Sequence, residues 1–150
     1  MNAANEMSSS FTAVSENEAF ARVAVAAFVL PLNPTMEELT EIKTIVSEAV
    51  TNAIIHGYGE RRGIIYLHCK IIGDRMELVI EDHGVGIEDV DLVRQPLYTS
   101  RPDLERSGMG FTIMESFVDE IEVDSAVNRG TRLRFVKYIR TPQSAARYEV

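Results

Sequence analysis

The stretch that decides the fold runs from residue 48 to residue 57 and reads Glu48-Ala49-Val50-Thr51-Asn52-Ala53-Ile54-Ile55-His56-Gly57. It closes a long amphipathic helical pattern, whose apolar residues recur three and four positions apart: Leu39, Ile42, Val46, Ala49, Val50 and Ala53. Glu48 and Asn52 are four residues apart and therefore lie one above the other, and His56 extends this row to Gly57, which ends the helix. Such a row could supply a base and a metal or phosphate ligand, or simply a solvated helix face.

The composition predicts one globular domain and limits the classes of partner that it is expected to bind. The chain has 150 residues, 45% of them hydrophobic, and a formal net charge of −8. That charge argues against a broad nucleic-acid-binding surface, although a basic protein surface could still bind. No apolar run reaches the roughly 18 residues of a membrane span, and the first residues lack a signal-peptide pattern. The single cysteine, Cys69, falls in a strand pattern and is expected to be buried in a cytoplasmic protein.

The first third of the chain predicts a strand and two helices. Weak alternation at 7–14 indicates a short edge strand, which is a candidate for dimerisation. Two capping boxes, Ser15 with Glu18 and Thr35 with Glu38, are expected to start helices at about 16–29 and 36–56. The first helix is expected to bury an apolar stripe that leaves Arg22 outside it: Phe20, Val23, Ala24, Ala27 and Phe28.

The remaining pattern alternates strands with two less regular segments. Strands at 64–72 and 75–81 flank Gly73-Asp74, a two-residue hairpin turn. Residues 88–107 lack periodicity, which is typical of a functional lid, and a short helix follows. Strands at about 120–125 and 131–139 precede a frayed tail at 140–150. Because helices and strands come in blocks, we expect one α+β domain over 1–150, with its core at about 7–139 and its helices on one face of a mixed sheet.

Two glycine motifs carry candidate chemistry. Asp82-x-Gly84-x-Gly86 follows a strand, and Gly108-x-Gly110 precedes a helix, where glycines let the backbone and its free N–H groups approach a phosphate. Each motif alone is weak, because such residues also make ordinary turns. Their spacing fits neither a Walker-type loop nor a Rossmann fingerprint.

Taken together and in this order, Glu48, Asn52, the two glycine motifs and Gly130-Thr131 resemble the Bergerat-type ATP-binding fold of gyrase, histidine kinases and mismatch-repair ATPases. The resemblance spans about residues 15–136. Residues 15–18, 47–57 and 105–115 narrow it to the anti-sigma serine kinases of spore-forming bacteria, and among these to the anti-sigma F factors.

This resemblance implies a two-layer α/β sandwich that binds ATP or ADP with Mg²⁺ and phosphorylates a serine of an anti-anti-sigma protein. It also implies that the protein binds and inhibits a sporulation sigma factor similar to sigma F, forms a homodimer, and contacts its partners through Arg22. Neither nucleic acid nor a membrane is an expected partner.

The resemblance also assigns roles to residues in the nucleotide site. Asp82 would read the adenine amino group with support from Thr131, and Gly84 and Gly86 would keep the loop close to the base. Asn52 would ligate Mg²⁺. The expected phosphate contacts are Arg106, Ser107, Gly108, Met109 and Gly110, with Arg106 neutralising the γ-phosphate.

Glu48 is the expected general base, with the ordering of water around magnesium as its alternative role. His56 stays outside the predicted site, and His83 is expected to point outward. Two other functions stay open: a nucleotide-gated module that sequesters a sigma factor without significant kinase turnover, and a stress-response kinase with a different sigma factor. Glu48, Asn52 and Arg106 favour a kinase, and the match at 106–115 favours the sporulation member.

Overall fold

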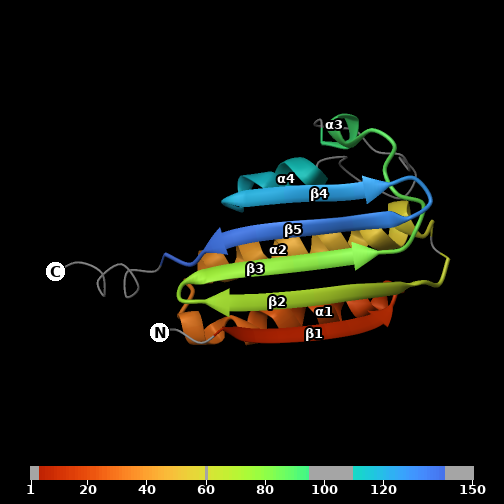
Figure 1. Ribbon diagram of the computed structural model, residues 1–150. Coiled ribbons are helices and arrows are strands. Elements are labelled where there is room, and N and C mark those ends of the chain that lie inside the picture. Colours follow the sequence, from red (N-terminus) through yellow and green to blue (C-terminus); the bar gives the residue numbers. More distant parts are fainter. Residues whose placement is uncertain (1–3, 60, 95–109, 141–150) are drawn as a thin grey trace.

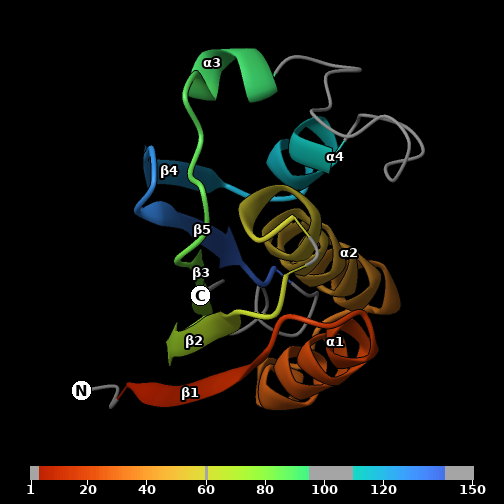
Figure 2. The same ribbon diagram turned by 90° about the vertical axis from the view of Figure 1, so that its right-hand side faces the viewer.

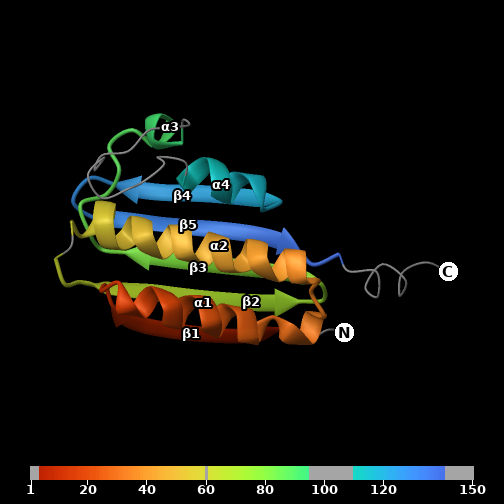
Figure 3. The same ribbon diagram turned by 180° about the vertical axis from the view of Figure 1, so that it is seen from behind.

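Helices and strands form two layers in the computed structural model, whose described residues are 4–59, 61–94 and 110–140 (Figure 1). One layer is a five-stranded sheet in the order β1-β2-β3-β5-β4. The strands are β1 (Asn5–Thr12), β2 (Ile64–Ile72), β3 (Arg75–Asp82), β4 (Glu120–Ala126) and β5 (Gly130–Tyr138). The helices α1 (Glu16–Phe28), α2 (Met36–Asn52) and α4 (Gly110–Ser116) cover one face, as the turned views show (Figures 2 and 3).

The sheet is antiparallel at all four of its pairings, and the expectation of a mixed sheet is therefore corrected. β3 and β4 do run in the same direction, as the crossover through α4 requires, but β5 lies between them. Their parallel relation therefore never becomes a hydrogen-bonded pairing. The α+β class and the placement of the helices on one face are confirmed.

The start of α2 is confirmed in detail. The Oγ1 of Thr35 accepts the Glu38 N–H at 3.0 Å, and the Glu38 carboxylate accepts the Thr35 N–H at 2.9 Å, which completes the capping box. The turn before it contains a short 3₁₀ helix (Leu30–Leu32) and a left-handed Asn33. The buried face of α2 is close to the predicted one: Ile42, Ile45, Val46, Ala49 and Val50, with Leu39 partly buried.

The start and the buried face of α1 differ from the prediction. Ser15 makes no side-chain cap: its backbone angles are already helical, and its hydroxyl donates to the Glu16 carboxylate at 3.2 Å. The Glu18 carboxylate accepts a hydrogen bond from Ser47 of α2 and pairs with Arg22 at 3.2 Å. The predicted stripe is also wrong, since the side chains of Phe20 and Val23 are 51% and 61% exposed. Apolar residues surround almost the whole helix, and smaller side chains take the inner positions: Ala21, Val25 and Val29.

The predicted faces of the central strands are confirmed. Buried side chains of β2, β3 and β5 meet the helices: Ile65, Leu67, Cys69, Ile71, Met76, Leu78, Ile80, Leu133 and Phe135. Burial raises the pKa of the Cys69 thiol to about 12, so this cysteine acts as an apolar core residue. Lys137 shares the inner face and donates from Nζ to the Phe117 carbonyl at 2.6 Å. Within the described part of the chain, no helix combines the length and apolarity needed to cross a membrane.

The two helix starts give a matched stability prediction. Replacing Thr35 by alanine should lower the free energy of unfolding by about 1 kcal/mol, because the Glu38 N–H loses its side-chain acceptor. Replacing Ser15 by alanine should change it by less than about 0.5 kcal/mol, since its side chain caps no helix N–H. Urea unfolding of both variants measures the difference, and equal losses would contradict it.

Candidate functional site

The end of α2 has a wider turn than the sequence predicts. α-Helical geometry stops at Asn52, and a π-helix continues from Ala53 to Gly57, closed by a hydrogen bond from the Tyr58 N–H to the Ala53 carbonyl at 2.9 Å. The expected α-helix through His56 is therefore corrected, and Gly57 lies within the π-helix rather than acting as a left-handed stop. Single π-helical turns are frequent at functional sites, and this one directs Gly57 onto β3.

Two glycines let the helix end meet the loop after β3. A side chain on Gly57 would place its Cβ 2.7 Å from the Asp82 carboxylate, and a side chain on Gly84 would place its Cβ 2.0 Å from the Gly57 carbonyl oxygen. That oxygen accepts the Val85 N–H at 2.8 Å. The loop therefore lies directly against the helix, at a distance that only glycine permits.

The other side of this loop is held by the turn between β4 and β5. The Asn128 N–H donates to the Val85 carbonyl at 2.7 Å, and Gly86, with a φ of 77°, packs against the Ala126 carbonyl. Ser125 accepts the Ile87 N–H at 2.7 Å, and its hydroxyl lies 2.8 Å from that of Thr131. The loop is thus fixed between two segments that are distant in the sequence.

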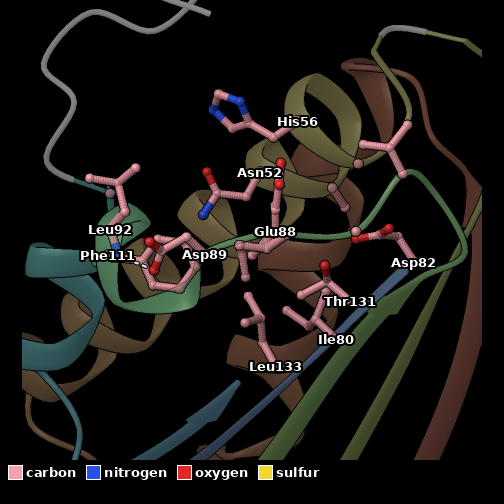
Figure 4. A pocket seen from close by; sticks show the side chains of 17 residues that line it. Asn52, His56, Ile80, Asp82, Glu88, Asp89, Leu92, Phe111, Thr131 and Leu133 are labelled. Carbon is pink, nitrogen blue, oxygen red and sulfur yellow. Dashed lines mark hydrogen bonds between the residues drawn. The ribbon is translucent and has the colours of Figure 1, made fainter. Parts of the chain in front are cut away.

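These contacts enclose a cavity of about 680 Å³, within the usual size of small-molecule sites. Figure 4 shows Asp82 at one end and Leu92 and Phe111 at the other, with residues of the sheet below and α2 above. The lining residues are Ala49, Asn52, Ala53, His56, Gly57, Ile80, Asp82, Val85, Gly86, Ile87, Glu88, Asp89, Leu92, Gly110, Phe111, Thr131 and Leu133.

Asp82 is the buried charged group of this cavity, with 5% of its surface exposed. Its Oδ1 accepts the Gly84 N–H at 2.9 Å. Burial raises the pKa of its carboxyl, and hydrogen bonds from the backbone N–H groups of Gly84 and Thr131 partly oppose this effect. A fixed carboxylate in an apolar wall is suited to accept an N–H from a planar ligand.

Asn52 is an unsatisfied polar group at the same cavity. Its Nδ2 is buried and has no hydrogen-bond partner within the described residues, which is unusual for a buried amide and makes it a candidate contact for a ligand. The described lining carries three carboxylates, Asp82, Glu88 and Asp89, and neither lysine nor arginine. A negatively charged ligand would therefore need cations from elsewhere.

The predicted site residues fall into four groups. Asn52, Asp82, Gly86, Gly110 and Thr131 surround the cavity together. Glu48 lies half-buried one turn before Asn52, and Gly84 packs on Gly57, but neither belongs to the described lining. Arg106, Ser107, Gly108 and Met109 lie outside the described residues, as does most of the predicted lid. Arg22 is on α1, away from the cavity, and His83 points outward as expected.

The sequence reasoning missed the apolar walls and the supports of the site. Ala49 and Ala53 leave room beside Asn52, and their spacing of four residues was a usable signal. Phe111 and Leu92 carried no such signal, since they look like ordinary core residues. His56, set aside above, lines the cavity, and Ser125 gave no signal because it lies in a predicted strand with nothing to distinguish it.

Comparisons with known proteins agree on the type of domain. The family model described as a histidine kinase-like ATPase domain matches residues 11–137. An anti-sigma F factor of Oceanobacillus iheyensis is 60% identical over 136 residues, which cover 90% of this chain and 93% of that protein. An anti-sigma F factor of Clostridium novyi is 56% identical over 138 residues, with coverages of 91% and 96%.

Two solved structures share the fold at low sequence identity. The RsbU and RsbW domains of Rv1364c from Mycobacterium tuberculosis superpose with a TM-score of 0.64 at 15% identity, covering 90% of this chain and 32% of that one. The catalytic domain of the histidine kinase ThkA gives a TM-score of 0.54 at 17% identity, with coverages of 89% and 97%.

The buried Asp82 gives a prediction with a defined sign. Because its pKa is higher in the folded chain than in the unfolded chain, the folded state holds the proton more tightly, and stability falls as the pH rises through that interval. Asp82→Asn keeps an oxygen acceptor for the Gly84 N–H without the charge. It should unfold at higher urea concentration than wild type at pH 7, and the gap should narrow in acid.

Urea unfolding between about pH 3 and pH 8 measures this dependence, since the interval brackets ordinary and raised aspartate pKa values. Asp124→Asn is the matched control, because it removes the same charge from an exposed aspartate of β4. An Asp82→Asn variant less stable than wild type at pH 7 would contradict the prediction.

Proposed function

This chain belongs to the anti-sigma F factor family of histidine kinase-like ATPase domains, and from this membership we propose that it is an ATP- and Mg²⁺-dependent protein serine kinase that also inhibits a sporulation sigma factor. The carrying observation is the convergence of Asn52, Asp82, Gly86, Gly110 and Thr131, from four separate motifs, around one cavity of about 680 Å³. An ATPase domain binds nucleotide, and this cavity is the place for it.

The adenine lies at the Asp82 end of the cavity in this proposal. The carboxylate is buried and fixed by the Gly84 N–H, so it can accept a hydrogen bond from the exocyclic amino group of adenine. Thr131 lies opposite Asp82 in the β3–β5 register and supports it from the sheet. Guanine carries an oxygen at the same position and would leave the carboxylate facing another acceptor.

The phosphates lie toward Asn52 and Gly110. We propose that Oδ1 of Asn52 ligates Mg²⁺ together with phosphate oxygens and water, because this cation takes oxygen ligands. Its buried Nδ2, which has no hydrogen-bond partner among the described residues, would donate to a phosphate oxygen. Bound magnesium would neutralise charge on the phosphate oxygens. No group of three or more acidic, histidine or cysteine side chains gathers as a metal site within the described part, which fits a cation held mainly through the nucleotide. Arg106, Ser107, Gly108 and Met109 are proposed to complete the phosphate contacts.

Glu48 is the proposed base for phosphoryl transfer. It precedes Asn52 by one turn on the same row of α2, so its carboxylate faces the side on which Asn52 reaches the cavity. Glu48 would accept the proton of a serine hydroxyl on an anti-anti-sigma protein while that oxygen bonds to the γ-phosphorus and ADP leaves. In the alternative role, Glu48 orders water near the metal.

The protein partners are proposed to bind at α1. This helix exposes Phe20 and Val23, and Leu30 is exposed in the 3₁₀ helix that follows. Exposed apolar side chains of this kind mark interaction sites, and Arg22 lies beside them. We propose that the sigma factor contacts Arg22 and that this interaction takes place in the cytoplasm. We also propose that β1, the edge strand of the sheet, pairs with β1 of a second copy of the chain.

The kinase reaction is tested with labelled ATP, Mg²⁺ and the anti-anti-sigma protein. Wild type should form phosphoserine on that protein, and Glu48→Gln should slow its formation by roughly 100-fold or more, because the general base is lost. ATP affinity should stay within about three-fold of wild type, since Glu48 is not expected to contact the base or the phosphates directly.

Glu37→Gln is the matched control, because it neutralises an exposed carboxylate in the first turn of the same helix. ATP binding by wild type without phosphoserine formation would overturn the kinase proposal and leave a nucleotide-gated sigma-binding module. An active Glu48→Gln variant would overturn the base assignment alone.

The partner surface is tested by sedimentation velocity with the sigma factor. Wild type should sediment as a dimer and gain the mass of the sigma factor, whereas Arg22→Ala should remain a dimer and lose about ten-fold or more in sigma affinity. Arg132→Ala is the control, since its side chain is similarly exposed, 43% against 39%, and also faces a carboxylate. Equal losses in both variants would contradict the assignment.

A further inference from the structure

Tyr58, which the proposed roles leave unused, sits at the junction of the helix end and the adenine end of the pocket. Its backbone closes the π-helix through the Ala53 carbonyl at 2.9 Å. Its own carbonyl accepts both the backbone N–H and the Nε of Arg61, at 3.0 and 2.9 Å. Hydrogen bonds therefore fix both peptide groups of Tyr58, independently of the contacts of its side chain.

The ring of Tyr58 is also tightly held. Only 8% of the residue is exposed, and the ring lies so close to Gly63 that a Cβ there would be 2.3 Å from a ring carbon. Gly63 is thus the position that admits the ring beneath the start of β2. A side chain packed in this way can hold a hydrogen-bonding group in one place.

The hydroxyl of Tyr58 uses both of its hydrogen-bonding capacities. It donates to the Ile64 carbonyl at 2.6 Å and accepts the His83 N–H at 2.8 Å. That N–H belongs to the peptide group joining Asp82 to His83, so the hydroxyl fixes the backbone next to the Asp82 carboxylate. Burial raises the pKa of Tyr58, which keeps the hydroxyl protonated and able to donate at neutral pH.

We propose that Tyr58 is a positioning residue for base selectivity: its hydroxyl ties β2 to the Asp82–His83 peptide and so holds the Asp82 carboxylate where it reads the amino group of adenine. This inference rests on the proposed function, because it assigns Tyr58 an effect on nucleotide choice. A residue that only stabilised the fold would affect the binding of every nucleotide. Tyr58 is instead proposed to affect only the recognition of the base.

The test compares ATP with inosine triphosphate, which carries an oxygen in place of the amino group. Tyr58→Phe keeps the ring and removes the hydroxyl. Its affinity for ATP should fall by about ten-fold while its affinity for inosine triphosphate stays within about two-fold, so the preference for ATP should fall about ten-fold. Deuterium exchange of the His83 backbone N–H should become faster in the variant, since its acceptor is gone.

Tyr66→Phe is the matched control. Tyr66 stacks on the side chain of the same His83, with ring centroids 4.9 Å apart, on the opposite face of the sheet. Because the described contacts give its hydroxyl no role at the Asp82–His83 peptide, both affinities should match wild type.

The outcomes separate this inference from the function on which it rests. A Tyr58→Phe variant that loses both nucleotides equally would show a merely structural role and overturn the inference. So would a variant that keeps the wild-type preference for ATP. Wild-type protein that binds neither nucleotide would overturn the proposed function, and the inference with it.

Discussion

The hydrogen bond from the Val85 N–H to the Gly57 carbonyl joins the end of α2 to the loop after β3, and the shape of the pocket depends on it. At this distance the Asp82 carboxylate lies against Gly57, and the loop lies against the helix backbone. The turn between β4 and β5 closes the other side through Gly86 and Ser125. Three segments far apart in the sequence must therefore stay in van der Waals contact for the cavity to exist.

Two polar groups of the cavity are buried in a way that lowers the stability of the folded chain. Burial disfavours the charged form of the Asp82 carboxyl and raises its pKa, and Nδ2 of Asn52 is a buried donor without a partner among the described residues. Such groups persist because the surrounding core holds them: the sheet beneath is filled by Ile80, Leu133 and Phe135. A ligand that hydrogen-bonds to both groups would stabilise the folded chain, because it binds the folded and not the unfolded form.

The sequence predicted those elements that are determined by contacts within a few residues better than those determined by contacts between distant segments. The cap formed by Thr35 and Glu38 involves only four consecutive residues, and it was predicted. The alternation of apolar and polar residues in β2 and β3 determines which side chains are buried, and it was predicted too. Ser15 and Glu18 have the same spacing, but the Glu18 carboxylate bonds to Ser47 of another helix, which no local pattern reports. The stripe of α1 failed because apolar residues surround that helix and leave several possible inner faces.

The site showed the same division. The motif glycines and Asp82 were visible because backbone approach demands those residue types, whereas the partners they approach came only with the fold. Gly63 is an example: its reason is the ring of Tyr58, five positions earlier and folded back onto it. The order of the strands was also out of reach, since the insertion of β5 between β3 and β4 is a property of the whole chain.

The π-helical turn at Ala53–Gly57 restricts how this segment can change in length during evolution. Deleting one of its residues would let the α-helix continue, and each residue of an α-helix turns the chain by about 100°. Gly57 and Tyr58 would then leave β3, even if every remaining amino acid were retained. A deletion here is therefore more damaging than most substitutions. The site therefore depends on the number of residues in this segment as well as on their identities.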